Sequence, residues 1–359
     1  MIKQQTYAWF GFILALVGCP AAAAPQQGLP DQSPRQRFAD WCEQRQALSP
    51  DARYTVETLL QISGTSDCET ADRLLSSAPA LDLSRLNLVD ISPLAVFDQL
   101  QWLSLNVNHI SDLRPLASLS QLTALYIDSN QVSDLTPLSG LTNLSVLSLF
   151  DNQISDLRPL SSLTRLTTLS LSDNQISDVR PLSSLTDLTL LSLLSNQVAD
   201  ITPLTTLTNL TWLSLGSNEI TDIRPLSTLT NLRWLALFDN QISDISPLAA
   251  LTNLNKLTIG NNQIANVESL QPLTNLTELL LFNNQIEDVS PLMVLTNLTW
   301  LDLYNNRVVD VSMLKSLSRL TWLDLRGNPL NLLTCPVQPE TICRFSPDLS
   351  ADSSPTPFE

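Results

Sequence analysis

Glycine and histidine are scarce in this chain. Only 8 of its 359 residues are glycine, against about 7% in an average protein, and no pair of them has the spacing of a nucleotide-binding glycine loop. The single histidine, His109, excludes a multi-histidine metal site and most histidine-based acid–base catalysis. We therefore expect no metal, no other cofactor and no catalytic residue.

Charged residues are also few, and most of them are acidic. They make up 15% of the chain, against about 25% on average, and the formal net charge is −16. Such a charge repels phosphate backbones and anionic lipid surfaces. The composition therefore argues against a nucleic-acid partner and against adsorption to a membrane surface.

The first 24 residues have the pattern of an export signal. Lys3 supplies the positive start, residues 7–18 form a 12-residue apolar run, and residues 21–24 are four alanines that suit cleavage. The apolar run is shorter than the ~20 residues that a membrane-spanning helix needs. We predict removal of residues 1–24 and a secreted, periplasmic or cell-surface location in a bacterium.

Cys19 offers an alternative to simple secretion. The tetrapeptide Leu16-Val17-Gly18-Cys19 resembles a bacterial lipoprotein box, in which the cysteine is acylated and becomes the new N-terminus. Pro20 is an awkward neighbour for such a box. Contact with a membrane would then be made only through this lipid, because no later apolar run is long enough to span one.

The remaining four cysteines form two sequence-local pairs, one near each end of the mature chain. In an oxidising compartment such pairs form disulfides. We therefore predict the bonds Cys42–Cys68 and Cys335–Cys343. A metal site is the rival interpretation, but no histidine lies near either pair.

Leucine is abundant, with 74 residues, and it recurs within a repeat of 22 residues. Each unit contains Leu-x-Leu followed by an asparagine three residues after the second leucine, and the units follow one another without insertions. A fixed period of this length is typical of a leucine-rich-repeat solenoid. The repeated asparagines are Asn108, Asn130, Asn152, Asn174, Asn196, Asn218, Asn240, Asn262, Asn284, Asn306 and Asn328.

The letters of one unit predict its structure. Leu-x-Leu is a short strand whose leucines face inward, and it pairs in parallel with the strand of the next unit at ~4.8 Å. The asparagine follows the strand, where its amide can satisfy backbone groups that lose their partners. An aspartate four residues later is expected to bond the backbone of the outer turn, and a proline there presets the chain direction.

The predicted fold is an α/β solenoid, a right-handed superhelix of about 12 coils with a concave parallel sheet. A helix from Ser49 to about Ile62, ended by Gly64, and a second over residues 69–75 should cap the N-terminal end. The expected segments are the signal (1–24), linker and N-terminal cap (25–80), solenoid (81–330), C-terminal cap (331–345) and a disordered tail (346–359).

The repeat Leu-x-x-Leu-x-Leu-x-x-Asn-x-Ile-x-Asp-Ile-x-Pro-Leu over residues 81–330 resembles the repeats of internalins and related bacterial surface proteins. This resemblance implies a protein partner bound on the concave face. The chain departs from the family at both ends, because we find neither a wall-anchoring tail nor an immunoglobulin-like domain after the repeats, and its two caps carry cysteines instead. We therefore do not transfer wall attachment or host invasion to it.

The concave face is expected to carry most of the aromatic side chains. Three outward columns flank the strand leucines, and they contain 10 of the 16 aromatic residues outside the signal. Exposed aromatic patches are typical of interaction sites, although aromatic ladders also stabilise neighbouring strands. The residues expected to contact a partner are Trp102, Tyr126, Phe150, Trp212, Trp234, Phe238, Phe282, Trp300, Tyr304 and Trp322, with the acids Asp302 and Asp324.

Asp302 and Asp324 occupy one column on adjacent strands, so their carboxylates should lie about 5 Å apart. They could hold a cation, meet a basic partner group, be relieved by Arg326, or simply be two solvated acids. Their spacing also suits a retaining glycosidase, but we expect nothing in an open face to raise the pKa of either acid. Lys256 and Glu278 should form an ordinary cross-strand ion pair.

Together these features predict an exported, acidic, monomeric protein that binds a protein or another macromolecule and is not an enzyme. The main rival is a non-catalytic scaffold or spacer of the cell envelope, which should self-associate. A more remote alternative is carbohydrate binding or glycoside hydrolysis around Asp302 and Asp324.

Overall fold

A computed structural model describes residues 37–345 of the chain. The expected signal (1–24), the lipoprotein box with Cys19, the first part of the linker and the tail (346–359) lie outside the described residues. Among the residues described, no helix is both long and apolar enough to cross a membrane.

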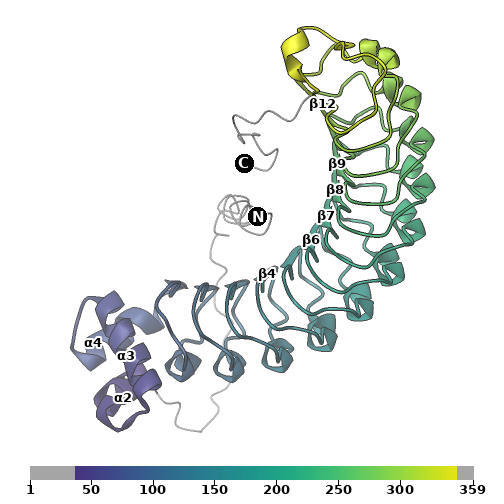
Figure 1. Cartoon of the computed structure of the whole chain (residues 1–359). Helices are drawn as coiled ribbons and strands as arrows, with labels where there is room; N and C mark the ends of the chain where they lie inside the picture. The colour runs from purple at the N-terminus through teal and green to yellow at the C-terminus, as the bar shows by residue number, and fades with distance from the viewer. Residues whose placement is uncertain (1–36, 346–359) are drawn as a thin grey trace. The chain divides into compact units, whose positions relative to one another are not determined.

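One parallel sheet runs through the described chain, with thirteen strands in strict sequence order (Figure 1). Each strand from β2 to β12 begins 22 residues after the previous one. The thirteenth strand comes from the C-terminal cap and was not predicted. The strands are β1 (Ala80–Asp82), β2 (Trp102–Ser104), β3 (Ala124–Tyr126), β4 (Val146–Ser148), β5 (Thr168–Ser170), β6 (Leu190–Ser192), β7 (Trp212–Ser214), β8 (Trp234–Ala236), β9 (Lys256–Thr258), β10 (Glu278–Leu280), β11 (Trp300–Asp302), β12 (Trp322–Asp324) and β13 (Cys343–Arg344).

The inward leucines build a single continuous core. Leu235 and Leu237, for example, are both fully buried, and the same positions are buried in the coils on either side. The strands pair residue for residue, so Leu235 lies opposite Leu213 on β7 and Leu257 on β9. Since every coil repeats the register of its neighbour, residues 22 apart form straight columns.

The repeated asparagines close each coil as predicted. Asn152 donates from Nδ2 to the carbonyls of Ile127 (2.9 Å) and Leu149 (3.2 Å), and its Oδ1 accepts the Val132 amide (2.9 Å). The side chain is nearly buried, so these backbone groups would otherwise have no partner in a core without water. One amide thus joins two consecutive coils.

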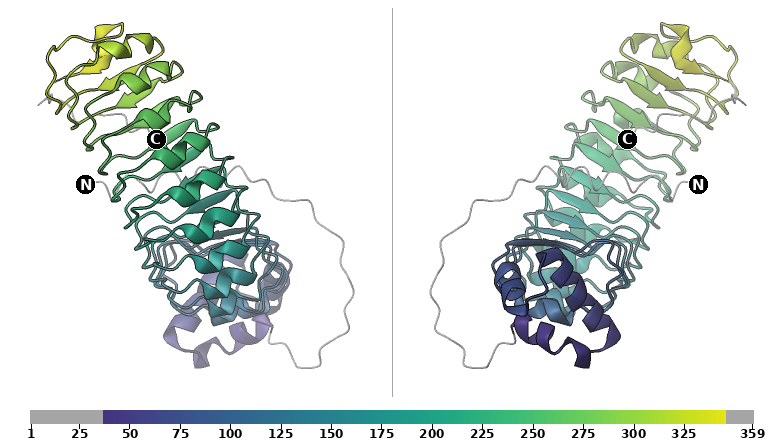
Figure 2. Two further views of the ribbon diagram at one scale, coloured as in Figure 1. Left: turned by 90° about the vertical axis from the view of Figure 1, so that its right-hand side faces the viewer. Right: turned by 90° about the vertical axis from the view of Figure 1, so that its left-hand side faces the viewer.

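Short 3-10 helices form the outer side of the stack, opposite the sheet (Figure 2). Each repeated aspartate accepts the backbone amide two residues later, as Asp112 does from Arg114 at 2.9 Å, and the predicted proline stands in the first turn. The helices are η4 (Ser92–Val96), η5 (Arg114–Leu116), η6 (Thr136–Leu138), η7 (Arg158–Ser162), η8 (Arg180–Ser184), η9 (Thr202–Thr206), η10 (Arg224–Thr228), η11 (Ser246–Ala250), η12 (Glu268–Leu270), η13 (Ser290–Val294) and η14 (Ser312–Ser316).

The N-terminal cap contains the two predicted helices and one that the pattern missed. Ser49 accepts the Ala52 amide at the start of the long helix, and Gly64 ends it with φ +71°, a conformation that glycine adopts without strain. The missed helix brings Phe38 against Phe97 of the first coil at 5.6 Å. The elements are α2 (Phe38–Glu43), η3 (Arg45–Ala47), α3 (Pro50–Ser63) and α4 (Cys68–Ser76).

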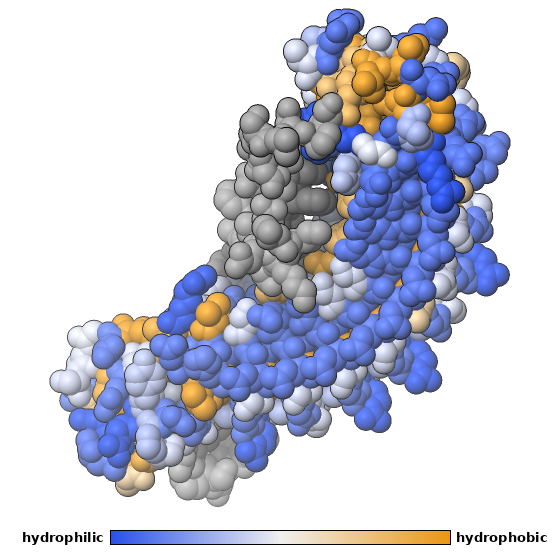
Figure 3. Space-filling view, in the orientation of Figure 1, coloured by the Kyte–Doolittle hydropathy of each residue, from blue (hydrophilic) through white to orange (hydrophobic). Residues whose placement is uncertain are grey.

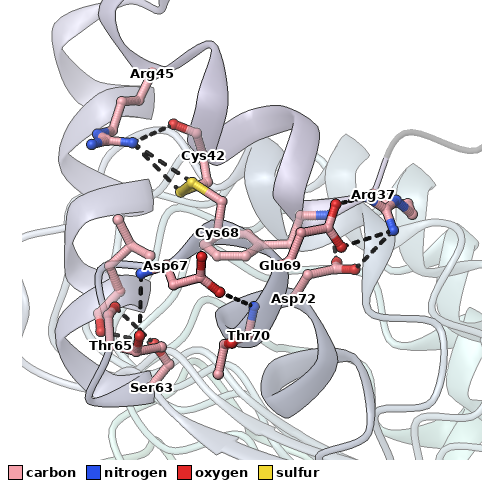
Figure 4. The surroundings of a disulfide bond; sticks show 12 residues. Arg37, Cys42, Arg45, Ser63, Thr65, Asp67, Cys68, Glu69, Thr70 and Asp72 are labelled. Carbon is pink, nitrogen blue, oxygen red and sulfur yellow. Dashed lines mark hydrogen bonds and ion pairs between the residues drawn. A yellow bond between two sulfur atoms is a disulfide. The ribbon is translucent and has the colours of Figure 1, made fainter.

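Both predicted disulfides are present. Cys42–Cys68 joins α2 to the start of α4 with a Cα–Cα distance of 5.6 Å. The Arg45 guanidinium donates to the Cys42 carbonyl and lies against both sulfur atoms (Figure 4). The three-helix cap is therefore held by a covalent bond as well as by packing.

The second disulfide, Cys335–Cys343, pins β13 beside β12 and so covers the last complete coil. This cover is partial. Leu333 occupies a position that is inward in the earlier coils, yet it and its neighbour Leu332 are 66% and 70% exposed. The C-terminal cap also contains η15 (Glu340–Ile342). The hydropathy-coloured surface has an apolar area at this end of the stack (Figure 3).

A column with left-handed backbone conformation was not foreseen. The residue before each repeated asparagine has positive φ, and serine, aspartate and asparagine occupy most of these positions. Asparagine and aspartate adopt this conformation at lower cost than other residues that have a side chain, and some of these side chains bond the equivalent residue of the preceding coil, as Asn305 does with Asn283 at 2.7 Å. Val107 is β-branched, and its φ of +58° therefore makes it a strained residue.

Replacing Val107 with asparagine is expected to stabilise the protein by about 1 kcal/mol, because asparagine enters the left-handed region at lower cost. Urea unfolding followed by circular dichroism would measure the change. The converse substitution, Asp151→Val, places valine at the equivalent position (φ +54°) and should destabilise by a similar amount. Equal stability of all three proteins would contradict the assigned strain.

Candidate functional site

The predicted contact residues lie on the inner side of the curved stack, where the strands are, while the 3-10 helices take the outer side (Figure 1). Five tryptophans each open a strand: Trp102, Trp212, Trp234, Trp300 and Trp322. Tyr126, Asp302 and Asp324 end strands, and Phe150, Phe238, Phe282 and Tyr304 follow two residues after a strand.

Four of the five tryptophans form stacked pairs on neighbouring strands. Trp212 and Trp234 have ring centroids 4.3 Å apart and an interplanar angle of 3°. Trp300 and Trp322 lie at 4.6 Å and 12°, and the Arg344 guanidinium lies 4.0 Å from the Trp322 ring centroid. Stacking therefore contributes to stability, about 0.5–1.5 kcal/mol per pair. All five rings are half-buried rather than bare.

This stacking limits what the tryptophans can bind. A sugar ring that packs on an indole needs a free ring face, and the faces between paired rings are too close to admit one. Trp300 and Trp322 thus stack on each other, and the Arg344 guanidinium lies over the Trp322 ring. Carbohydrate binding by face stacking is consequently disfavoured within each pair.

Two phenylalanines fill gaps left by glycines, a relation that the sequence columns contained but that we did not recognise. A methyl group added to Gly216 would lie 2.6 Å from a ring atom of Phe238, and one added to Gly260 would lie 2.5 Å from Phe282. Each ring therefore lies over the glycine of the preceding coil. The alternation of glycine and phenylalanine thereby makes a continuous apolar strip.

Tyr126 is less accessible than expected. It is 8% exposed and packs against Trp102 with ring centroids 5.6 Å apart, and burial raises its pKa. Tyr304, in contrast, is 41% exposed. The accessible aromatic surface is therefore richer toward the C-terminal coils than toward the first ones.

The two acids have different surroundings, and the interpretation as two solvated acids is wrong. Asp324 is 2% exposed and accepts from Arg326 through Nε at 3.0 Å and Nη2 at 2.6 Å. Asp302 lies opposite it in the register, is half-buried, and accepts the Tyr304 amide at 2.8 Å. Of the predicted alternatives, pairing with Arg326 is therefore the one that holds for Asp324.

The expectation that neither acid would have a raised pKa is also wrong. Burial, with a further contribution from the Asp324 charge, raises the pKa of Asp302 to about 7. Burial likewise raises the pKa of Asp128, in the third column, to about 6. A protonated Asp302 could act as an acid, but Asp324 is held by a guanidinium, so the pair lacks the free second carboxylate that a retaining glycosidase uses.

Asp302→Asn is expected to stabilise the protein at pH 8 by about 1–3 kcal/mol. The folded-state pKa is above the ordinary value, so the acid favours folding only when protonated, and its stabilisation is lost as pH rises through 7. The difference between variant and parent in urea unfolding should grow between pH 5 and pH 8. Asp310→Asn is the control, because the Ser312 amide lowers the Asp310 pKa; a gain there too would contradict the assignment.

Polar side chains form the remainder of this face. Lys256 and Glu278 make the predicted ion pair, at 2.7 Å. An unpredicted chain of amides runs from Asn305 through Asn283 and Asn261 to Asp239. The described residues contain no group of three or more histidine, cysteine, aspartate or glutamate side chains placed to hold a metal ion.

Comparison with known proteins agrees with this architecture. The family model described as Leucine Rich repeats (2 copies) matches residues 98–140, 142–172, 164–206, 208–250, 230–273, 252–292 and 274–316. No protein among the curated ones is similar enough to count as a relative.

Solved structures of internalins from Listeria monocytogenes are similar to the chain. Internalin InlF is 37% identical, with 80% of this chain and 85% of that one covered and a TM-score of 0.76. Internalin C2 is also 37% identical, with coverage of 56% and 91% and a TM-score of 0.54. The functional domain of InlJ, 21% identical with coverage of 82% and 67% and a TM-score of 0.63, shares the fold. The chain thus belongs to the internalin-like leucine-rich-repeat proteins.

Proposed function

We propose that this chain binds a protein partner on its concave aromatic face and has no catalytic activity. The observation that supports this most is the concentration of aromatic side chains in the columns of that face, above all around Tyr304, Trp300 and Trp322. Rigid aromatic anchors are enriched among residues that dominate binding energy. Proteins with this fold typically bind proteins and are generally non-catalytic.

The acidic net charge of the chain, −16, favours a partner with basic or polar groups. We further propose that the protein is exported by a bacterium and remains in the envelope or the medium as a monomer. Export fits the two disulfides, which form in oxidising compartments. Acylation of Cys19 would tether it to a membrane; cleavage after residue 24 would release it.

Changing Trp300 and Trp322 together to alanine is expected to abolish capture of the partner. The altered and unaltered chains would serve as baits for an envelope extract of the source organism, with quantitative mass spectrometry as the readout. Loss of one stacked pair and one cation–π contact should lower stability by about 1–3 kcal/mol, in addition to the burial that the two half-buried rings lose. The thermal midpoint should therefore fall by a few degrees.

Tyr54→Ala is the matched control, because Tyr54 is 45% exposed on the N-terminal cap and its loss should leave capture unchanged. Retention of the same proteins by the double variant would contradict the proposal. Collapse of its thermal midpoint would assign the tryptophans to stability instead. The rival scaffold role predicts self-association, which sedimentation at increasing concentration would detect.

A further inference from the structure

We propose that Asp302 receives an arginine side chain of the protein partner. This inference rests on the proposed function and specifies the chemistry that the partner presents to the C-terminal coils. It is carried by a comparison between two adjacent coils of this chain, in which the residue two positions after the equivalent aspartate is Tyr304 in one and Arg326 in the other.

Asp302 and Asp324 are held in the same way by their own coils. Each ends its strand, the two lie opposite each other in the register, and each accepts the backbone amide two residues later through Oδ1, at 2.8 Å and 3.1 Å. The second carboxylate oxygen, Oδ2, accepts no backbone hydrogen bond in either coil. The two acids are thus repeats of one structural position.

The residue two positions after the aspartate differs between these coils. Arg326 stands two residues after Asp324 and places its guanidinium on both carboxylate oxygens. The equivalent residue after Asp302 is Tyr304, which has no cationic group. Asp302 makes no ion pair and accepts no side-chain hydrogen bond within residues 37–345. Asp302 therefore lacks the hydrogen-bonded guanidinium that Asp324 has, although the Arg326 charge also acts on Asp302 and lowers its pKa.

The surroundings of Asp302 suit a planar cation. The neighbouring charges are already paired, Asp324 with Arg326 and Glu278 with Lys256, and Arg344 lies over Trp322 two strands away from Asp302. Tyr304 is exposed beside the acid, and aromatic rings pack well against guanidinium groups. The Arg326 guanidinium, 5.5 Å from the Tyr304 ring centroid, is an example within the same site.

Trp300 supplies a reporter for this place. The indole Nε1 of Trp300, on the strand that carries Asp302, is buried and has no hydrogen-bond partner. Because this indole lies on the same strand as Asp302, its resonance reports on a group that binds there.

The test uses the peptide acetyl-Gly-Arg-Gly-amide as probe and its citrulline analogue, which keeps the shape without the charge. Binding to the full chain would be followed at pH 8, above the pKa of Asp302, through the ¹⁵N indole resonance of Trp300, assigned with Trp300→Phe. We expect a saturable shift with the arginine peptide and at least a tenfold weaker response to the citrulline peptide.

Two pairs of variants separate the site from general effects. Asp302→Asn should abolish the saturable shift, whereas Asp310→Asn, an acid on the outer turn, should leave it unchanged. Tyr304→Arg should also abolish it, because this change recreates the arrangement of Asp324 and Arg326 and fills the site from within. Tyr304→Phe, which keeps the ring, should retain binding.

An equal response to both peptides, no saturable shift with the arginine peptide, or binding that persists in Asp302→Asn would overturn the inference. The proposed function fails differently. If the Trp300/Trp322 variant loses a partner that Asp302→Asn captures as well as the parent does, the docking face stands and the arginine contact does not.

Discussion

Leu237→Ala is expected to destabilise the protein by about 2–5 kcal/mol, the usual range for a leucine truncated in a packed core. Leu237 is completely buried, and its amide donates to the Thr258 carbonyl of the next coil at 2.7 Å. Removal of three carbon atoms leaves a cavity that the flanking coils cannot close, because their own leucines are fixed in register. Urea unfolding of the folded chain measures the loss directly.

Leu332→Ala is the matched control for this substitution. Leu332 is 70% exposed at the C-terminal end, so the same change of side chain should alter the free energy of unfolding by less than about 0.5 kcal/mol. In a solenoid each coil contacts only its neighbours, and the loss at Leu237 should also show as faster hydrogen exchange in the adjacent coils. Equal stability of the two variants would refute the inward placement of Leu237.

Asn240→Ala should destabilise the protein by about 2–6 kcal/mol, because it leaves at least two buried backbone groups unpaired at about 1–3 kcal/mol each. Its Nδ2 donates to the Leu215 carbonyl at 2.9 Å and its Oδ1 accepts the Ile220 amide at 2.9 Å. The side chain is 9% exposed, so water has little access to replace these bonds. The expected loss therefore comes from polar groups rather than from packing.

Gln241→Ala tests whether this loss belongs to Asn240 or to the region. Gln241 is the next residue, its side chain is exposed, and only its backbone bonds the preceding coil. We expect its replacement to be nearly neutral. A loss at Gln241 as large as that at Asn240 would mean that the asparagine amide does not stabilise the coil junction.

The repeat itself could be predicted because it is over-determined. Eleven asparagines and the paired leucines recur at the same positions of the 22-residue unit, so a wrong assignment in one coil would conflict with all the others. The caps lack this redundancy. Helix α3 was predicted from Ser49 and Gly64, which mark its ends, whereas α2 has no comparable signal and is held by Phe38 and the Cys42–Cys68 bond.

The sequence predicted which residues lie on the concave face but not which contacts they make. Column positions follow from the period, so the aromatic residues were placed correctly on neighbouring strands. Their exposure was not, since Tyr126 is buried and the indoles are half-buried. Side-chain torsion angles decide whether two rings stack or both face the solvent, and a repeat period carries no information about them.

The sequence by itself determined the solenoid, the register of its columns and the disulfide pairing, because these depend on spacing along the chain. Only the tertiary structure decided that Trp300 stacks on Trp322, that Phe282 lies over Gly260, and that Arg326 binds Asp324 while no guanidinium of residues 37–345 is hydrogen-bonded to Asp302. The physical reason is that these contacts join side chains across coils, where burial and torsion angles, rather than periodicity, select the partner of each group.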